Sequence, residues 1–184
     1  MGRGEGIAVG REATFIGHST SPPVLAMLSP ISRNRMDAML TPPSNLWHPE
    51  LRALYTLWLT HCPDGGQGVP LAGDLEPSEL RRWLGNVLIM DVTEDGGFAY
   101  SYYGRSLARA FGETRLGQTL EALPGEQKQI LHQEYEQVRS GRQPLHRRHT
   151  ADFNGIRRTW ERVVFPLSSD GETIDKLLVA AYEL

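Results

Sequence analysis

The stretch YYGRSLARAFGETRLGQTLEAL, residues 102–123, joins the aromatic end of an expected strand to short helical segments that glycines separate. Gly104 begins the turn out of the strand, and Gly112 suits the end of the first helix, because glycine readily adopts the left-handed conformation found there. The apolar positions of that helix follow a helical period: Leu107, Ala110 and Phe111. The stretch holds no catalytic triad, metal cluster or phosphate-binding loop, so the elements around it must indicate the function.

Strands are predicted on both sides of this stretch. Before it, residues 86–93 (NVLIMDVT) and 98–103 (FAYSYY) are separated by EDGG, a hairpin signal. After it, the pattern predicts one helix and three strands, over residues 125–141, 143–152, 157–167 and 173–184. Asn154-Gly155 and Asp170-Gly171 favour tight turns between those strands. The order predicts an α+β domain with one five-stranded antiparallel sheet and a helical insert between strands two and three.

An amphipathic helix is predicted ahead of the sheet. Apolar side chains recur at helical spacing in LWHPELRALYTLWLTHC, residues 46–62, and Pro49 suits its first turn. Residues 62–70 are expected to be a loop and residues 76–85 a second short helix. Residues 1–44 are rich in proline and lack a steady period, so we expect a disordered leader before a folded domain over 45–184. Alternatively, translation begins within that leader, at Met27, Met36 or Met39.

The strand patterns indicate which faces of the sheet are covered. In FAYSYY, the residues Phe98, Tyr100 and Tyr102 alternate with smaller ones, as on an edge strand with unequal faces. The runs VLIM (87–90) and LLVAA (177–181) do not alternate, which indicates strands that are buried on both sides. The insert over 104–141 can cover one face, and the 46–61 helix or a second subunit would cover the other.

This order of elements resembles the PAS domain, and is most similar to a compact bacterial PAS family that often occurs without an output domain. Two stretches carry the resemblance: residues 102–123, where strand two ends and helices begin, and ERVVFPLSSDGETIDKLLVAAYEL, residues 161–184, as the last hairpin. The resemblance implies a sensory or regulatory module that binds a small ligand or a signalling partner, and that pairs with a second copy. Fold alone does not fix which of these applies.

The composition indicates which partners and which cellular compartment to expect. The net charge of -3 over 184 residues argues against binding to nucleic acid through overall electrostatics. Cys62 is the single cysteine, so a disulfide within the chain is impossible and a reducing cytoplasmic compartment is expected. The longest apolar runs are too short to span a bilayer, so no membrane association is expected.

Two groups of residues are candidate sites. Aromatic side chains that could line a ligand pocket, or simply fill the core, are Tyr103, Phe111, Tyr135 and Trp160. The apolar stripe of the first helix could form a dimer interface or pack on its own sheet, through Leu51, Leu54, Tyr55 and Trp58. We expect a homodimer, and we expect a small apolar ligand if these aromatic side chains line a pocket.

The sequence gives little support for a bound flavin, haem or metal ion. Residues 104–141 contain no cysteine, which excludes a covalent flavin adduct of the kind the family forms there. His132 lies on the insert helix but at the flank of its apolar stripe, so we do not expect haem. His146 and His149 are three apart on a strand and should point to opposite faces, so no metal site is predicted. Cys62 beside His61 is expected to be structural.

An enzyme is the alternative to a sensory module. A small α+β isomerase or cyclase would need a buried acid or histidine in its pocket, and the charged candidates on strands are Asp91 and Glu161. The inner positions are otherwise mostly apolar, so no catalytic residue is predicted. The basic residues of HRRH (146–149) and Arg157-Arg158 are expected to be a solvated face or a surface for an acidic partner.

Overall fold

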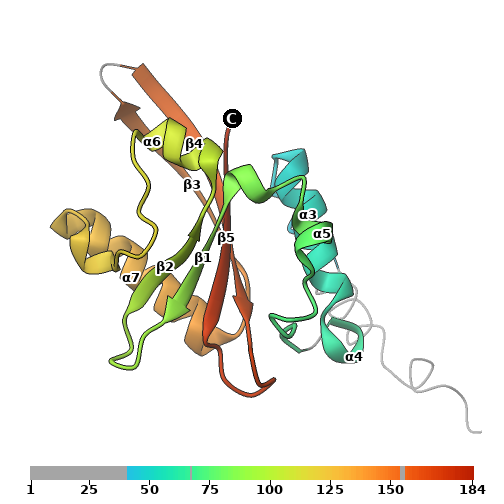
Figure 1. Ribbon diagram of the computed structural model, residues 1–184. Coiled ribbons are helices and arrows are strands. Elements are labelled where there is room, and N and C mark those ends of the chain that lie inside the picture. Colours follow the sequence, from blue (N-terminus) through green and yellow to red (C-terminus); the bar gives the residue numbers. More distant parts are fainter. Residues whose placement is uncertain (1–40, 67, 154–155) are drawn as a thin grey trace, which may run out of the picture.

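The computed structural model describes residues 41–66, 68–153 and 156–184 (Figure 1). Nearly all of the expected leader and the Asn154-Gly155 turn lie outside these residues. The five strands are β1 Val87–Val92, β2 Phe98–Tyr103, β3 Leu145–Phe153, β4 Ile156–Leu167 and β5 Lys176–Glu183. They form one antiparallel sheet in the order β2-β1-β5-β4-β3. The predicted α+β class, with its insert between the second and third strands, is confirmed.

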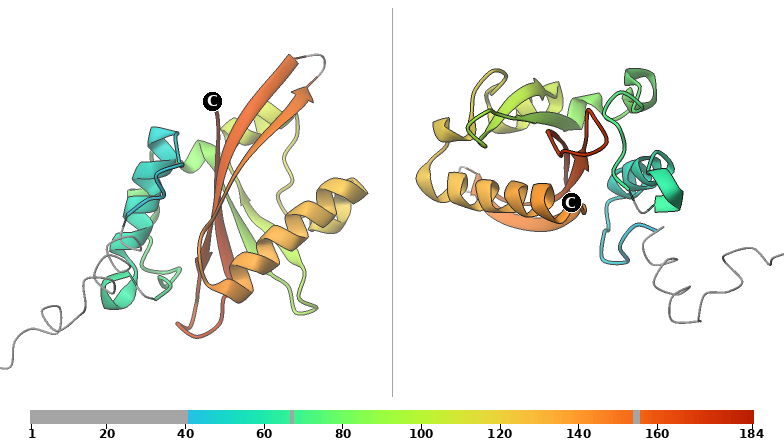
Figure 2. Two further views of the ribbon diagram at one scale, coloured as in Figure 1. Left: turned by 180° about the vertical axis from the view of Figure 1, so that it is seen from behind. Right: turned by 90° about the horizontal axis from the view of Figure 1, so that it is seen from below.

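Helices lie on both sides of this sheet (Figure 2). Those before the sheet are α3 Pro49–Thr60, α4 Pro63–Gly66, α5 Pro77–Leu80 and the 3-10 turn η1 Leu84–Asn86. Those of the insert are α6 Arg105–Phe111, the 3-10 turn η2 Leu120–Ala122 and α7 Gly125–Gly141. The one-turn helix α4 lies where the sequence predicts only a loop.

The central strand β5 is buried on both faces, as the absence of alternation predicts. Leu177 and Val179 belong to a core cluster shared with the insert, whereas Leu178 and Ala180 belong to a second cluster shared with α3. All four side chains are at most 1 % exposed. The sheet is therefore the middle layer of three, with a separate core on each side.

Helix α3 covers the second face of the sheet within its own chain. Leu51 and Leu54 are fully buried, Trp58 is 3 % exposed, and Tyr55 is partly buried against Phe165 with ring centroids 5.4 Å apart. The Trp58 indole N–H donates to the Pro166 carbonyl at 3.0 Å. The apolar stripe of α3 therefore packs on the sheet of its own chain.

The beginning of α3 is held by a buried carboxylate. Glu161 on β4 is fully buried and accepts hydrogen bonds from the backbone N–H groups of Trp47, at 3.0 and 3.1 Å, and His48, at 2.6 Å. The His146 ring lies 2.9 Å from the same carboxylate. Burial alone would raise the pKa of Glu161, but these hydrogen bonds and the attraction to His146 outweigh it and hold the pKa below its usual range.

The glycines of residues 102–123 allow the insert to lie against the sheet. Gly104 donates to the Val87 carbonyl at 2.8 Å, and a Cβ there would lie 2.5–2.6 Å from three backbone oxygens. Gly117, with φ of +79°, donates to the Tyr100 carbonyl at 2.8 Å, and Tyr100 donates to the Gln118 carbonyl at 2.9 Å. The outer edge of β2 is thus paired with the insert itself.

Two expectations for this region are wrong. The register between β1 and β2 shifts by one residue at Ser101, so Tyr100 and Tyr103 share the insert face while Tyr102 packs on the α3 face. A bulge of this kind reverses the side-chain alternation beyond it. In α6, Leu107 is buried as expected, but Ala110 is exposed and does not belong to the apolar stripe.

We predict that Leu54→Glu combined with Trp58→Glu unfolds the protein instead of converting a dimer to a monomer. Both side chains lie in the core between α3 and the sheet, and a charge buried there without a partner is strongly unfavourable. Circular dichroism and light scattering distinguish the two outcomes. Thr56→Glu, at an exposed position of the same helix, is the control and should stay folded. A folded monomeric double variant would contradict this packing.

We predict that Glu161→Gln lowers the free energy of unfolding by about 1–3 kcal/mol at neutral pH, because two partly buried N–H groups lose a charged acceptor. The pKa of Glu161 is lower in the folded chain, so its contribution is complete above the unfolded pKa and is lost as pH falls through the folded value. The difference between wild type and variant should therefore shrink below about pH 4. Urea titrations across that range measure it, with exposed Glu94→Gln as the control.

Candidate ligand site beneath the helical insert

A polar group of side chains lies between the sheet and the insert. Strand alternation places Trp160, Arg162 and Val164 on the insert face of β4, with Glu161 on the other face. Tyr100 and Tyr103 reach the same layer from β2, and Tyr135 reaches it from α7. Three phenols, an indole and a guanidinium therefore lie between the sheet and the insert, in a layer that is otherwise apolar.

The three tyrosines are held in their neutral form by burial. Burial raises the pKa of Tyr135 to about 12, and it also raises the pKa of Tyr100 and of Tyr103. The rings of Tyr100 and Tyr103 lie 5.5 Å apart, and that of Tyr135 lies 5.4 Å from Phe98. At neutral pH these hydroxyls can exchange hydrogen bonds with a ligand, but they cannot act as bases.

Two buried N–H donors in this layer have no acceptor within the described residues: Trp160 Nε1 and Arg162 Nε. The indoles of Trp58 and Trp83, by contrast, donate to backbone carbonyls at 3.0 and 3.1 Å. An unpaired buried donor costs about 1–3 kcal/mol, so two near each other require an explanation. Trp160 and Arg162 are alternate residues of β4, so their side chains lie on the same face of the sheet. One acceptor group could therefore approach both donors from the same side.

Arg162 is only partly engaged by the protein. One terminal nitrogen of its guanidinium contacts Glu134 of α7, a carboxylate that Arg147 also approaches at 3.5 Å. Glu134 is 8 % exposed, so this ion pair lies at the rim of the core. The ion pair holds the guanidinium in place, while its Nε has no acceptor among the residues that the structure describes.

The four predicted pocket residues divide into two pairs. Tyr103 and Tyr135 pack in the core layer described above, with Tyr135 only 2 % exposed. Phe111 and Trp160 contact each other with ring centroids 5.2 Å apart, and Phe111 is 41 % exposed. The sequence prediction missed Tyr100, Glu134 and Arg162. The period-two alternation of β4 could have indicated Arg162, because it shares a face with Trp160.

The sequence also offers three histidines as possible haem or metal ligands. His132 on α7 is exposed, and its ring lies 5.6 Å from that of Phe98. His146 and His149 pair in register with Val163 and Trp160 on opposite faces of the sheet, as predicted. Across the described parts of the chain, no group of three or more metal-binding side chains is found.

The single cysteine is poorly suited to nucleophilic chemistry. Cys62 is buried, and burial raises the pKa of its thiol to about 12. Its neighbour His61 contacts Glu79 at 3.1 Å instead of the thiol.

Neither strand carboxylate considered for an enzyme reaches the tyrosine layer. Glu161 holds the start of α3 on the opposite face, and Asp91 contacts Lys176 and Ser101, both at 2.8 Å, near the surface.

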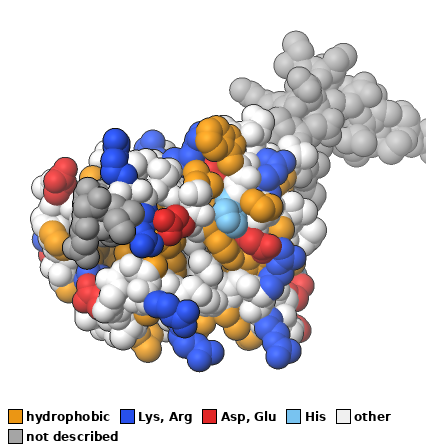
Figure 3. Space-filling model, turned by 90° about the horizontal axis from the view of Figure 1, so that it is seen from above, with side chains coloured by type: hydrophobic (Ala, Val, Ile, Leu, Met, Phe, Trp, Pro, Cys, Tyr) orange, Lys and Arg blue, Asp and Glu red, His pale blue; other side chains and the backbone are white. Residues whose placement is uncertain are grey.

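Most of the basic residues on β3 and β4 have nearby acidic or aromatic partners. Arg147 approaches Glu134, Arg148 approaches Glu161 and stacks over Trp47, and Arg158 contacts Glu183. Figure 3 shows side chains of both signs interspersed on the face seen from above. This pattern fits the expected solvated face.

Within the residues that the structure describes, no helix has the length and apolar character needed to cross a bilayer.

Comparison with known proteins identifies a PAS domain within the chain. Residues 96–184 match a family model described as the PAS fold, which confirms the resemblance seen in the sequence. No curated protein matches the chain. Among solved structures, the PAS domain of BvgS from Bordetella pertussis is 13% identical with a TM-score of 0.45, over 54% of this chain and 76% of that one. A PAS domain from Colwellia psychrerythraea is 12% identical with a TM-score of 0.42, over 58% and 95%. The LOV domain of the blue-light photoreceptor Aureochrome1 is 17% identical with a TM-score of 0.42, over 60% and 88%.

We predict that Tyr135→Ala lowers the free energy of unfolding by about 3–5 kcal/mol, the usual cost of truncating a buried aromatic residue. Tyr135 is fully enclosed between α7 and the sheet. Leu116→Ala, at a position 59 % exposed, should change stability by less than about 0.5 kcal/mol and serves as the control. Equal effects of the two changes in urea denaturation would show that α7 does not pack as described.

Proposed function

Because the chain contains a PAS domain, matched over residues 96–184, we propose that it is a non-catalytic sensory or regulatory module that binds a small ligand beneath its helical insert. The observation that carries this proposal is a pair of buried donors, Trp160 Nε1 and Arg162 Nε, for which the described part of the chain offers no acceptor. Their chemistry indicates a ligand with an acceptor oxygen, such as a carboxylate or a carbonyl. The surrounding apolar side chains indicate that the rest of the ligand is apolar.

Charge supports a carboxylate in preference to a neutral carbonyl. Arg162 is a permanent cation, and hydrogen bonds from a guanidinium to a carboxylate are among the strongest in proteins. Glu134 already balances that charge, so the ligand carboxylate would share Arg162 with it or replace it. Arg147, close to Glu134 and 56 % exposed, is a second cation that could hold Glu134 if Arg162 turned toward the ligand.

Residue chemistry in this layer supports binding over catalysis. The tyrosines are neutral and cannot act as bases, and both carboxylate oxygens of Glu134 are engaged by arginines. An isomerase or cyclase is the alternative function. Turnover of a bound carboxylate ligand by the purified protein would favour that alternative.

We further propose that the module is cytoplasmic and works as a homodimer with a signalling partner. Since α3 packs on its own sheet, the dimer interface would use other apolar surface. Large apolar side chains that remain exposed are Trp47, Leu71, Phe111, Leu116, Ile130 and Leu184.

We predict that aromatic and medium-chain carboxylates raise the melting temperature of the full chain, whereas the matching alcohols do so less. Trp160→Phe keeps a ring against Phe111 but removes the donor, so it should reduce the ligand-induced shift. The unliganded variant should lose less than about 1 kcal/mol, because it also loses an unpaired donor. Trp47→Phe, at an exposed tryptophan outside the site, is the control.

Native mass spectrometry of the purified protein tests the same proposal independently. A co-purifying small acid that is lost in Trp160→Phe and in Arg162→Met would support it. Equal ligand-induced shifts in wild type and in both variants would overturn it.

A further inference from the structure

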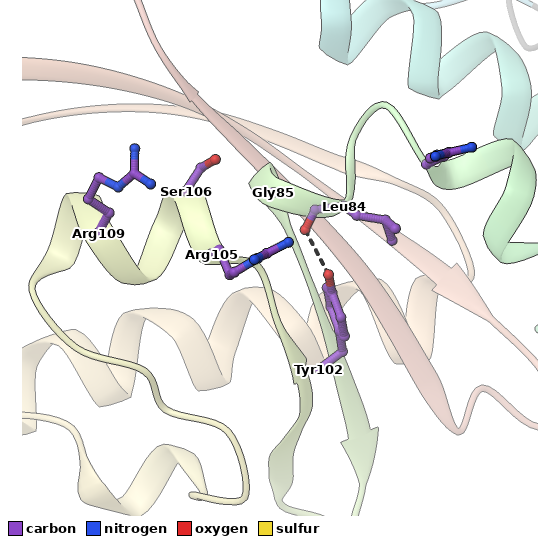
Figure 4. A pocket seen from close by; sticks show the side chains of 7 residues that line it. Leu84, Gly85, Tyr102, Arg105, Ser106 and Arg109 are labelled. Carbon is purple, nitrogen blue, oxygen red and sulfur yellow. Dashed lines mark hydrogen bonds between the residues drawn. The ribbon is translucent and has the colours of Figure 1, made fainter.

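A hollow lies between α6, the end of β2 and the 3-10 turn η1 (Figure 4). Its volume is about 490 Å³, within the range of about 300–1,000 Å³ that is usual for small-molecule sites. We call it the arginine hollow; its lining residues are Arg81, Leu84, Gly85, Tyr102, Arg105, Ser106 and Arg109. Tyr102 packs with the α3-side cluster, whereas Trp160 packs with the insert-side cluster. The two sites therefore use different residues.

The arginine hollow is positively charged, although the chain as a whole is acidic. Three of its described lining residues are arginines and none is Asp or Glu. Arg81, Arg105 and Arg109 form no ion pair with any residue that the structure describes, whereas the neighbouring Arg82 contacts Glu50 at 2.6 Å. Arg105 and Arg109 are four apart on α6, an arrangement in which like charges repel and destabilise a helix. A bound anion would remove that repulsion.

The floor of the hollow suits an organic group. The Tyr102 hydroxyl donates to the Leu84 carbonyl at 3.0 Å, which fixes the ring beside the Leu84 side chain (Figure 4). A Cβ on Gly85 would lie 2.6 Å from Ser106 Oγ, so glycine keeps this part of the floor clear. Ser106 adds an exposed hydroxyl on the same helix as Arg105 and Arg109.

We propose that the arginine hollow binds a small organic phosphate, with the phosphate held by the arginines and the organic part lying over Tyr102 and Leu84. One guanidinium group can donate to two phosphate oxygens at once. A phosphate monoester also carries nearly two negative charges at neutral pH. A volume of about 490 Å³ leaves room for an organic group beside the phosphate. The inference goes beyond the ligand proposed under the insert, because it concerns a separate site and a separate ligand class.

The test is calorimetric titration of the full chain with phenyl phosphate, inorganic phosphate and phenol, at about 50 mM salt, where charge interactions are only partly screened. We expect phenyl phosphate to bind at one site, about tenfold tighter than inorganic phosphate, and phenol not to bind. No saturable binding of phenyl phosphate would overturn the proposal. Binding to phosphatidic acid vesicles without binding to phenyl phosphate would also overturn it, because it would assign the site to a lipid surface.

Variants locate the binding. Arg105→Gln and Arg109→Gln should each weaken phenyl phosphate binding by about tenfold, the usual loss for one charge-assisted contact. Ser106→Glu, which places a negative charge on the exposed rim, should abolish it while the melting temperature stays close to that of wild type. Lys128→Gln removes the same charge from α7, outside the hollow, and should bind as wild type does. An equal loss in Lys128→Gln would overturn the proposal in favour of diffuse electrostatics.

Discussion

Strand β5 has apolar side chains on both faces, and this constraint organises the rest of the molecule. Leu177 and Val179 require one cover and Leu178 and Ala180 require another, since leaving either pair in water would forfeit about 1.5–3 kcal/mol for each large side chain. The insert supplies the first cover and α3 supplies the second. The helix ahead of the sheet therefore completes the second core of this chain.

Strand β4 connects the two cores through neighbouring residues that point to opposite faces. Glu161 holds the start of α3 on one face, and Arg162 lies beside the proposed ligand on the other. In the proposed function, a ligand that draws Arg162 from Glu134 acts on the strand whose preceding residue anchors the N-terminal segment. Trp47 extends this connection to the surface, because it stacks on Arg148 while its backbone N–H binds Glu161. This connection carries a signal only if the N-terminal segment has two arrangements and the ligand binds one of them more tightly than the other.

The order of the elements and the two-sided burial of β5 could be predicted from the sequence because periodicity and turn residues are local properties. The side chains of the candidate site were harder to predict, for three physical reasons. The bulge at Ser101 moves Tyr103 onto the insert face beside Tyr100, and no residue type marks that bulge. Arg162 and Glu134 pair across 28 positions of sequence, so each alone has the pattern of a surface charge. Whether α3 packs on its own sheet depends on its length and the path to β1, which the apolar stripe does not encode.

Helix α6 stands between the two proposed sites, and its short length matters for both. Leu107 and Phe111 face the insert-side core and Trp160, whereas Arg105, Ser106 and Arg109 line the arginine hollow. The helix has only seven residues and is too short to be stable alone, so its position depends on its contacts. Gly104 fixes its beginning against Val87, and Gly112, with φ of +80°, closes its end. An anion on one side and a carboxylate ligand on the other would therefore bear on the same helix, whose two ends are set by glycines of the stretch that identifies the fold.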